Sequence, residues 1–160
     1  LINNILQFKE KYILTKKEIK ISKIIEEIDS FCHELNLKSK NFLFKIEIPE
    51  NLDNKIIYTN ENKLIYTIFN LIELLHKISQ KHIYINFFIN RNEFIIAIQS
   101  SYFENGSFRT IMNNTENTEN IYDELYKNDM TVIKQNLEAL KGEIIFDKNE
   151  KRILIKLPFD

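Results

Sequence analysis

The apolar residues of the chain recur at helical spacing in some stretches and alternate with polar residues in others. Residues 22–37 repeat apolar side chains every three or four positions, and Ser22 is placed to cap the N-terminus of this predicted helix. A second helix is predicted from Glu61 to about Gln80, after the cap residue Asn60. This helix is apolar on most sides, so we expect it at the centre of the core, with Leu64, Ile68, Leu71 and Leu75 buried.

A third helix is predicted from Asp129, as the N-cap residue, to Leu140. Gly142 follows as the expected C′ residue, where glycine commonly adopts the left-handed conformation. Residues 101–126, which precede this helix, are polar and rich in Asn, Thr and Glu. They predict a long loop that is mobile or folds over a neighbouring pocket.

Six strands are expected where apolar and polar residues alternate or form short apolar runs. Three helices distributed among these strands predict one two-layer α+β sandwich, with the helices on one face of a mixed sheet. Arg91 and Asn92 are expected at a hairpin turn. The predicted strands cover residues 42–48, 55–58, 82–89, 93–99, 143–146 and 152–157.

The first residues of the chain predict a short amphipathic helix. Leu1, Ile5 and Phe8 form an apolar stripe with little to bury against within one domain. The chain opens directly in this helical pattern, without a methionine, so we expect it to be a fragment of a longer protein. In that protein the stripe would belong to a dimer interface.

Composition narrows the classes of function. The 160 residues carry 22 basic and 23 acidic side chains, a net charge of −1, which gives no electrostatic footprint for nucleic acid or anionic lipid. Cys32 is the single cysteine, so an internal disulfide is excluded and a reducing compartment is favoured. No apolar run is long enough for a membrane span.

Four segments carry a family resemblance. They are residues 1–8, the stretch from Tyr58 to Ser79, the stretch from Glu138 to Ile144, and the closing Leu157-Pro158-Phe159. Their order and spacing resemble the catalytic and ATP-binding domain of sensor histidine kinases, which has the Bergerat or GHKL fold. The resemblance implies a mostly antiparallel mixed sheet, with residues 1–20 as the end of a dimerisation helix and its connecting segment, and 21–160 as the ATP-binding-type domain.

The first chemical motif of that family, the N box, reads Asn-x-x-x-Asn-Ala-x-Lys. The matching residues here are Asn70, Leu74, Leu75 and Lys77. Asn70, Leu74 and Lys77 share one helix face, which in the family looks into the nucleotide pocket. The family's second Asn holds Mg²⁺, an ion that requires oxygen ligands, and Leu74 offers none. Asn70 and Lys77 remain as candidate nucleotide contacts, or as a structural amide and a solvated ammonium.

Both glycine boxes of the family are also changed. The chain has two glycines, where average usage of about 7% predicts about eleven. In the first box, Ser100 stands at the Asp that would accept a hydrogen bond from adenine, and Tyr102 and Glu104 stand at the glycines. In the second box, which would bind phosphate at the start of the last helix, Asp129 would place a negative charge.

No other chemistry is indicated by the sequence. His33, His76 and His82 are scattered, without metal-ligand spacing, and no metal site is expected. Cys32 and His33 point to different helix faces and so form no nucleophile pair, and Cys32 is expected in the core. No catalytic residue is assigned.

The resemblance and these departures favour a degenerate histidine-kinase-like domain, a pseudokinase of a two-component system. We expect it to bind no Mg-ATP cofactor and to act through another signalling protein, either a response regulator or a histidine kinase, or through a second copy by the N-terminal helix. One alternative is a diverged but active sensor kinase that binds ATP through Asn70, Lys77 and a lid formed by residues 101–126, with Ser100 as a further candidate contact. Another is a small-ligand sensor with Leu74, Leu75 and Tyr102 as apolar walls. A cytoplasmic location is expected, as the cytosolic part of a larger protein with or without a membrane anchor.

Overall fold

The structure, a computed structural model, describes residues 16–38, 43–52, 55–79, 81–105 and 121–159. Within these ranges the side chains of residues 51, 104, 105 and 121–128 are not described. The helix predicted at the start of the chain therefore lies outside the described residues.

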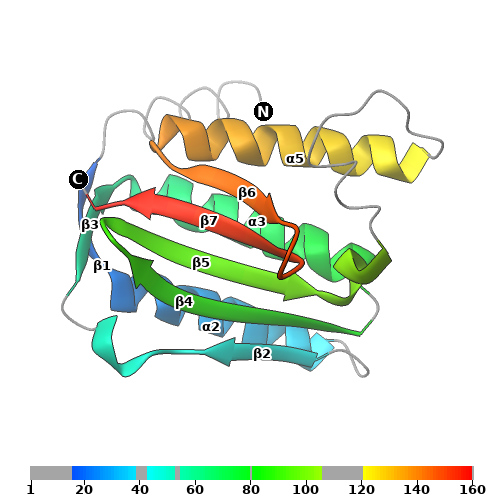
Figure 1. Cartoon of the computed structure of the whole chain (residues 1–160), viewed down its shortest axis with the longest axis horizontal. Helices are drawn as coiled ribbons and strands as arrows, with labels where there is room; N and C mark the ends of the chain where they lie inside the picture. Colours follow the sequence, from blue (N-terminus) through cyan, green and yellow to red (C-terminus); the bar gives the residue numbers. More distant parts are fainter. Residues whose placement is uncertain (1–15, 39–42, 53–54, 80, 106–120, 160) are drawn as a thin grey trace.

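A five-stranded mixed sheet forms one layer of the fold (Figure 1). Its strand order is β2-β4-β5-β7-β6, and β2 pairs with β4 in parallel while the other neighbours are antiparallel. The strands are β2 (Leu43–Glu47), β4 (His82–Asn90), β5 (Glu93–Ser100), β6 (Glu143–Asp147) and β7 (Arg152–Pro158). The predicted strands are thus confirmed to within about one residue at most ends, apart from Phe42, which lies outside the described residues.

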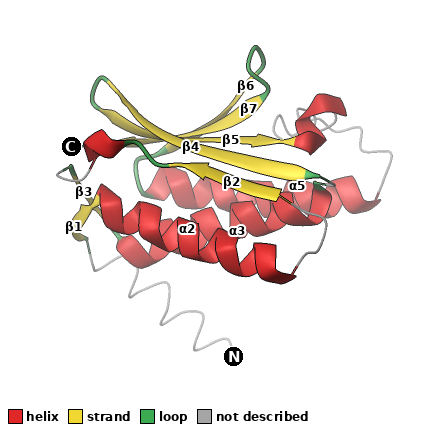
Figure 2. Ribbon diagram, turned by 90° about the horizontal axis from the view of Figure 1, so that it is seen from below, coloured by secondary structure: helices red, strands yellow, loops and turns green. Residues whose placement is uncertain are grey.

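In the described part of the chain, three helices form the second layer, on one face of this sheet (Figure 2). They are α2 (Ile21–Lys38), α3 (Glu61–Ile78) and α5 (Ile121–Ala139). α3 contacts both of the other helices. The predicted two-layer α+β sandwich is confirmed.

A small second sheet lies at one end of the molecule (Figure 1). It joins β1 (Lys17–Lys20) to β3 (Ile56–Thr59) in antiparallel register. Ile19 and Ile57 are register partners and both are buried, so this sheet is anchored to the core cluster. A short 3-10 helix, η1 (Glu50–Leu52), precedes β3.

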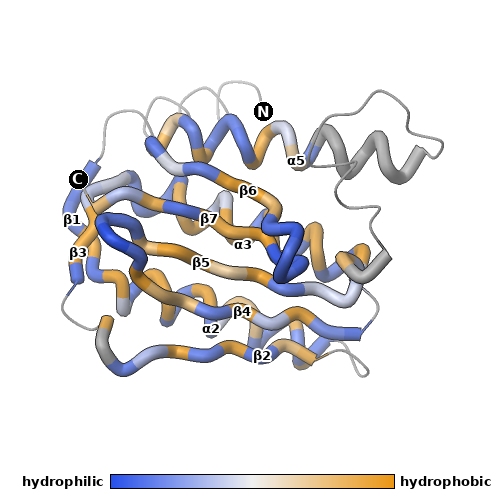
Figure 3. The backbone as a smooth tube through the Cα atoms, in the orientation of Figure 1, coloured by the Kyte–Doolittle hydropathy of each residue, from blue (hydrophilic) through white to orange (hydrophobic). Residues whose placement is uncertain are grey.

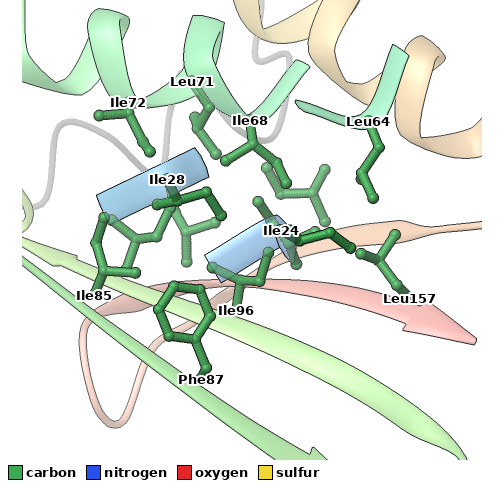
Figure 4. Packing of buried hydrophobic residues seen from close by; sticks show 14 of the residues in the cluster. Ile24, Ile28, Leu64, Ile68, Leu71, Ile72, Ile85, Phe87, Ile96 and Leu157 are labelled. Carbon is green, nitrogen blue, oxygen red and sulfur yellow. The ribbon is translucent and has the colours of Figure 1, made fainter. Parts of the chain in front are cut away.

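The core is centred on α3, as the apolar residues on most sides of this helix predicted. Leu64, Ile68, Leu71 and Leu75 are fully buried. Figure 4 shows residues of α3 facing Ile85, Phe87 and Ile96 of the sheet, with Ile24 and Ile28 of α2 close by. Figure 3 shows the hydropathy along the backbone. Hydrophobic positions follow the central strands, and polar positions gather at the β4–β5 turn.

The predicted cap of α2 is wrong. The helix begins at Ile21, so Ser22 lies inside the first turn and does not cap it. The Ile21 backbone N–H instead donates a hydrogen bond to the Lys55 carbonyl at 2.9 Å. Tertiary pairing with the residue before β3 therefore sets the start of this helix.

The predicted start of the last helix is also wrong. α5 begins at Ile121, eight residues before Asp129, so Asp129 lies in the helix and is not its N-cap. The predicted loop over residues 101–126 is shortened at both ends. Its first residues form a 3-10 helix, η2 (Ser101–Asn105), and residues 121–126 are helical, while 106–120 lie outside the described residues.

The end of α5 differs from the prediction by one residue. Gly142 donates its backbone N–H to Leu137 O at 2.7 Å, and Lys141 donates to Glu138 O at 2.9 Å. This is the Schellman pattern with Lys141 at C′, where its φ is +60°, and Gly142 at C″. Space is tight at Gly142, because a Cβ there would come within 2.9 Å of Leu157 Cδ2, 3.2 Å of Lys156 O and 3.3 Å of Leu137 O.

A carboxylate ties three elements together at the start of α3. Glu61 accepts contacts from Lys17 of β1 at 2.7 Å and from Lys23 of α2 at 2.6 Å. The Glu61 side chain is 11% exposed. Hydrogen bonds from both lysines hold the pKa of Glu61 below its ordinary value, and Glu61 raises the pKa of Lys23.

Glu61→Gln is expected to lower the free energy of unfolding at pH 7 by about 0.5–1.5 kcal/mol, since both lysines are half-exposed and the pair is screened. Because the folded-state pKa of Glu61 is depressed, its contribution is present above the unfolded value of about 4.5 and is lost as the pH falls through the folded pKa. Urea denaturation of both proteins from pH 7 to pH 3 measures this difference. Glu34→Gln, an exposed change on α2, is the control, and a wild-type advantage that stays constant to pH 3 would contradict the assignment.

Candidate functional site

A pocket of about 230 Å³ lies between α3 and α5. From α3 it is lined by Asn70, Glu73, Leu74 and Lys77, at the spacing of one helix face. From α5 it is lined by Asp129, Val132 and Ile133. The structure therefore brings together three of the predicted N-box positions with Asp129 of the predicted second glycine box.

The pocket has an apolar floor and a polar rim. Leu74 and Ile133 are buried, at 4% and 2% exposure, while Val132 is half-exposed. Asn70 is partly buried, and Glu73, Lys77 and Asp129 are exposed. No hydrogen bond or ion pair reaches these four polar side chains from the described part of the chain.

Leu75 and Ser100 do not line this pocket. Leu75 is fully buried in the core, on another side of α3. Ser100 closes β5 and is 5% exposed. Its Oγ forms a hydrogen bond with Ser79 Oγ and accepts another from the Tyr102 backbone N–H at 3.1 Å. The Ser100 hydroxyl is thus used within the fold, where it joins the end of α3 to η2.

The start of η2 is fixed by further local contacts. Ser101 Oγ accepts a hydrogen bond from the Lys81 backbone N–H at 3.2 Å. Tyr102 packs partly buried against the core cluster. Glu104 lies within η2, and its side chain is outside the described residues. The residues at the predicted glycine positions therefore form a short helix in place of an open loop.

Phe103, between those two positions, was missed by the sequence analysis. It is 2% exposed and meets Phe146 of β6 edge-to-face, with ring centroids 5.5 Å apart. A large aromatic residue inside a polar stretch was the available signal, because such a residue usually buries its ring. Phe103 anchors η2 to the sheet.

The described residues contain no candidate metal site and no reactive cysteine. Within them, no group of three His, Cys, Asp or Glu residues is placed to hold a metal ion. Cys32 is buried as expected, and burial raises its pKa to about 12, so the thiol is unreactive at neutral pH. His76 stacks on Phe44, and burial lowers its pKa. No helix among the described residues has the length and apolar character to cross a membrane.

Comparison with solved structures identifies the fold. The catalytic domain of the histidine kinase ThkA matches with a TM-score of 0.67 at 14% identity, covering 91% of this chain and 98% of that one. Acinetobacter baumannii histidine kinase AdeS matches with a TM-score of 0.60 at 14% identity, over 92% of this chain and 68% of that one. The mycobacterial sensor histidine kinase MprB matches with a TM-score of 0.61 at 11% identity, over 90% and 97%.

No protein-family model matches the chain, and no curated protein matches it in sequence. The chain therefore has the histidine kinase catalytic-domain fold at low sequence identity. The α3–α5 pocket lies at the position where the resemblance placed the nucleotide-facing side of the N box.

Proposed function

We propose that this chain is a degenerate histidine-kinase-like domain of a two-component signalling protein, which binds no Mg-ATP and acts through protein contacts. The observation that carries the proposal is the course of α5. The resemblance places the phosphate-binding turn at the start of the last helix, near Asp129. Here α5 begins at Ile121 and continues through that position.

A helix binds phosphate through the backbone N–H groups of its first turn, which have no partner within the helix. Asp129 lies two turns inside α5, where backbone N–H groups are used by the helix itself. Its carboxylate lines the pocket and repels a triphosphate. Both changes act against phosphate binding.

The residues present do not fit the magnesium and adenine of the family. Leu74 occupies the magnesium position and offers no oxygen. The hydroxyl of Ser100, at the adenine position, already forms hydrogen bonds with the Ser79 hydroxyl and the Tyr102 backbone N–H. The pocket volume of about 230 Å³ is also below the 300–1,000 Å³ of typical cofactor sites.

Asn70 and Lys77 favour the second candidate, a diverged but active kinase. Both line the pocket, and neither has a partner within the described part of the chain. An active kinase would use both as nucleotide contacts in the unmodified chain. ATP binding by the unmodified chain therefore separates the two candidates.

Leu74→Asn alone is expected not to restore Mg-ATP binding, because it replaces one of at least three lost contacts. Thermal-shift measurements on the wild type and on Leu74→Asn, with ATP and with or without Mg²⁺, test this. Leu74→Met, which keeps an apolar side chain of similar volume, is the control. A magnesium-dependent shift in the wild type would favour the active kinase, and one that appears in Leu74→Asn but not in Leu74→Met would show that the other lost contacts matter little.

Protein contacts are proposed to run through a second copy or another signalling protein. The predicted amphipathic helix with Leu1, Ile5 and Phe8 supplies an apolar stripe for pairing. A chain extended by the upstream helix is expected to sediment as a dimer, and Ile5→Asp is expected to dissociate it. A longer chain that sediments as a monomer would remove this part of the proposal.

A further inference from the structure

We infer that the α3–α5 pocket receives a basic side chain of a partner protein, an ammonium or guanidinium group on an aliphatic stem. The inference rests on the proposed function, because it names the partner chemistry for the pocket that Mg-ATP no longer uses. It is carried by the size of the pocket, its apolar floor and the charges on its rim.

The size of the pocket suits one long side chain. Its volume of about 230 Å³ is below the 300–1,000 Å³ of typical small-molecule sites, so the pocket suits one side chain better than a nucleotide. The pocket lies between two helices and is open to solvent on its rim, where Glu73, Lys77 and Asp129 are exposed.

The floor suits an aliphatic stem. Val132 offers the aliphatic surface, because about half of its side chain is uncovered, while Leu74 and Ile133 also line the pocket and are almost fully buried. Lysine and arginine bury their methylene stems along apolar surfaces while the charged head stays near water. The same apolar floor gives nothing to a phosphate or a carboxylate.

The rim suits a positive charge. Two carboxylates, Glu73 and Asp129, face one ammonium, Lys77, which leaves an excess of negative charge around the pocket. Asp129 stands on α5, on the wall opposite Lys77. The Asn70 amide oxygen is a further acceptor. An arginine or lysine head between Glu73 and Asp129 complements both.

Titrations of the ¹⁵N-labelled chain, followed by amide NMR, test the inference with blocked amino acids as probes. N-acetyl-arginine methylamide and its lysine counterpart are expected to give saturable shifts at residues 70–77 and 129–133, weakening as salt is raised. N-acetyl-norleucine methylamide, which has the stem without the charge, and N-acetyl-glutamate methylamide are expected to give none there. Equal shifts with the norleucine probe, or no localised shifts with the basic probes, would overturn the inference.

Matched variants locate the charge. Asp129→Asn is expected to weaken the arginine probe about two- to fivefold, as for an exposed ion pair, and Asp129→Lys to abolish its binding. Glu138→Gln removes an exposed carboxylate from the same helix away from the pocket and is expected to change nothing. Equal weakening by Glu138→Gln would show unspecific charge attraction and contradict the site.

Two further titrations, with butylamine and with Mg-ATP, distinguish a failure of this inference from a failure of the proposed function. Butylamine binding more tightly than the blocked arginine would assign the pocket to a free amine and overturn the partner assignment. Mg-ATP displacing the arginine probe would overturn the proposed function itself. If neither Mg-ATP nor the basic probes bind, only the present inference fails.

Discussion

Leu71→Ala is expected to lower the free energy of unfolding by about 2–5 kcal/mol. Leu71 is fully buried in the middle of α3, between the sheet and the neighbouring helices (Figure 4). Truncation removes three heavy atoms from a close-packed site that helices and strands surround, so the cavity cannot collapse fully. Urea denaturation followed by far-UV circular dichroism measures the loss.

Leu37→Ala is the matched control for this change. Leu37 lies near the end of α2 and is 74% exposed, so the same truncation is expected to alter stability by less than about 0.5 kcal/mol. A Leu71→Ala loss as small as that of the control would place α3 outside the core and refute the sandwich as described.

Phe103→Ala is expected to lower the free energy of unfolding by about 3–5 kcal/mol. Its ring is buried and packs edge-to-face on Phe146, and aromatic pairs of this kind add about 0.5–1.5 kcal/mol to their burial. Because Phe103 is the side chain that anchors η2, hydrogen exchange at residues 101–103 is expected to accelerate together with the loss of stability. Chemical denaturation and amide exchange on the same samples measure both effects.

Tyr58→Ala serves as the aromatic control, since Tyr58 is 59% exposed on β3. It is expected to change stability by less than about 0.5 kcal/mol and to leave the exchange of η2 unaltered. A Phe103→Ala protein with wild-type stability would mean that η2 is a loosely held loop, available to open toward a ligand.

Much of the fold could be predicted from the sequence because hydrophobic periodicity reports burial directly. The apolar pattern on most sides of residues 64–78 identified α3 as central, and Leu64, Ile68, Leu71, Ile72 and Leu75 of this helix are fully buried. Asn60 caps this helix as predicted, accepting a hydrogen bond from the Lys63 backbone N–H at 3.1 Å. Local chemistry and tertiary packing agree here.

The predicted starts of α2 and α5 were wrong because each rested on a local cap residue, while contacts elsewhere in the chain set where the helix begins. Ser22 and Asp129 are good cap residues, but the first turn of α2 is fixed by pairing with Lys55, and α5 extends eight residues before Asp129. Ile121, Tyr122, Leu125 and Tyr126 recur at helical spacing and carried the signal for the longer helix. The polar residues Asp123, Glu124, Lys127 and Asn128 in the same stretch made this apolar spacing hard to recognise.

The candidate site was predicted only in part. The spacing of Asn70, Leu74 and Lys77 placed them on one face, and they do line one pocket. Glu73, Val132 and Ile133 complete the lining, and only the packing of α5 on α3 brings the two helices' residues together. The use of the Ser100 hydroxyl by Ser79 joins residues 21 positions apart, which no local pattern reveals.

Isothermal titration calorimetry of the unmodified chain with ATP, in the presence and absence of Mg²⁺, tests the central claim most directly. Each lost charge-assisted contact is worth about 1.5–3 kcal/mol, so two or more weaken a micromolar site by about a hundredfold or more. The account predicts no saturable heat at micromolar ATP under either condition. A saturable, magnesium-dependent signal at micromolar ATP would contradict it and establish a nucleotide-binding domain.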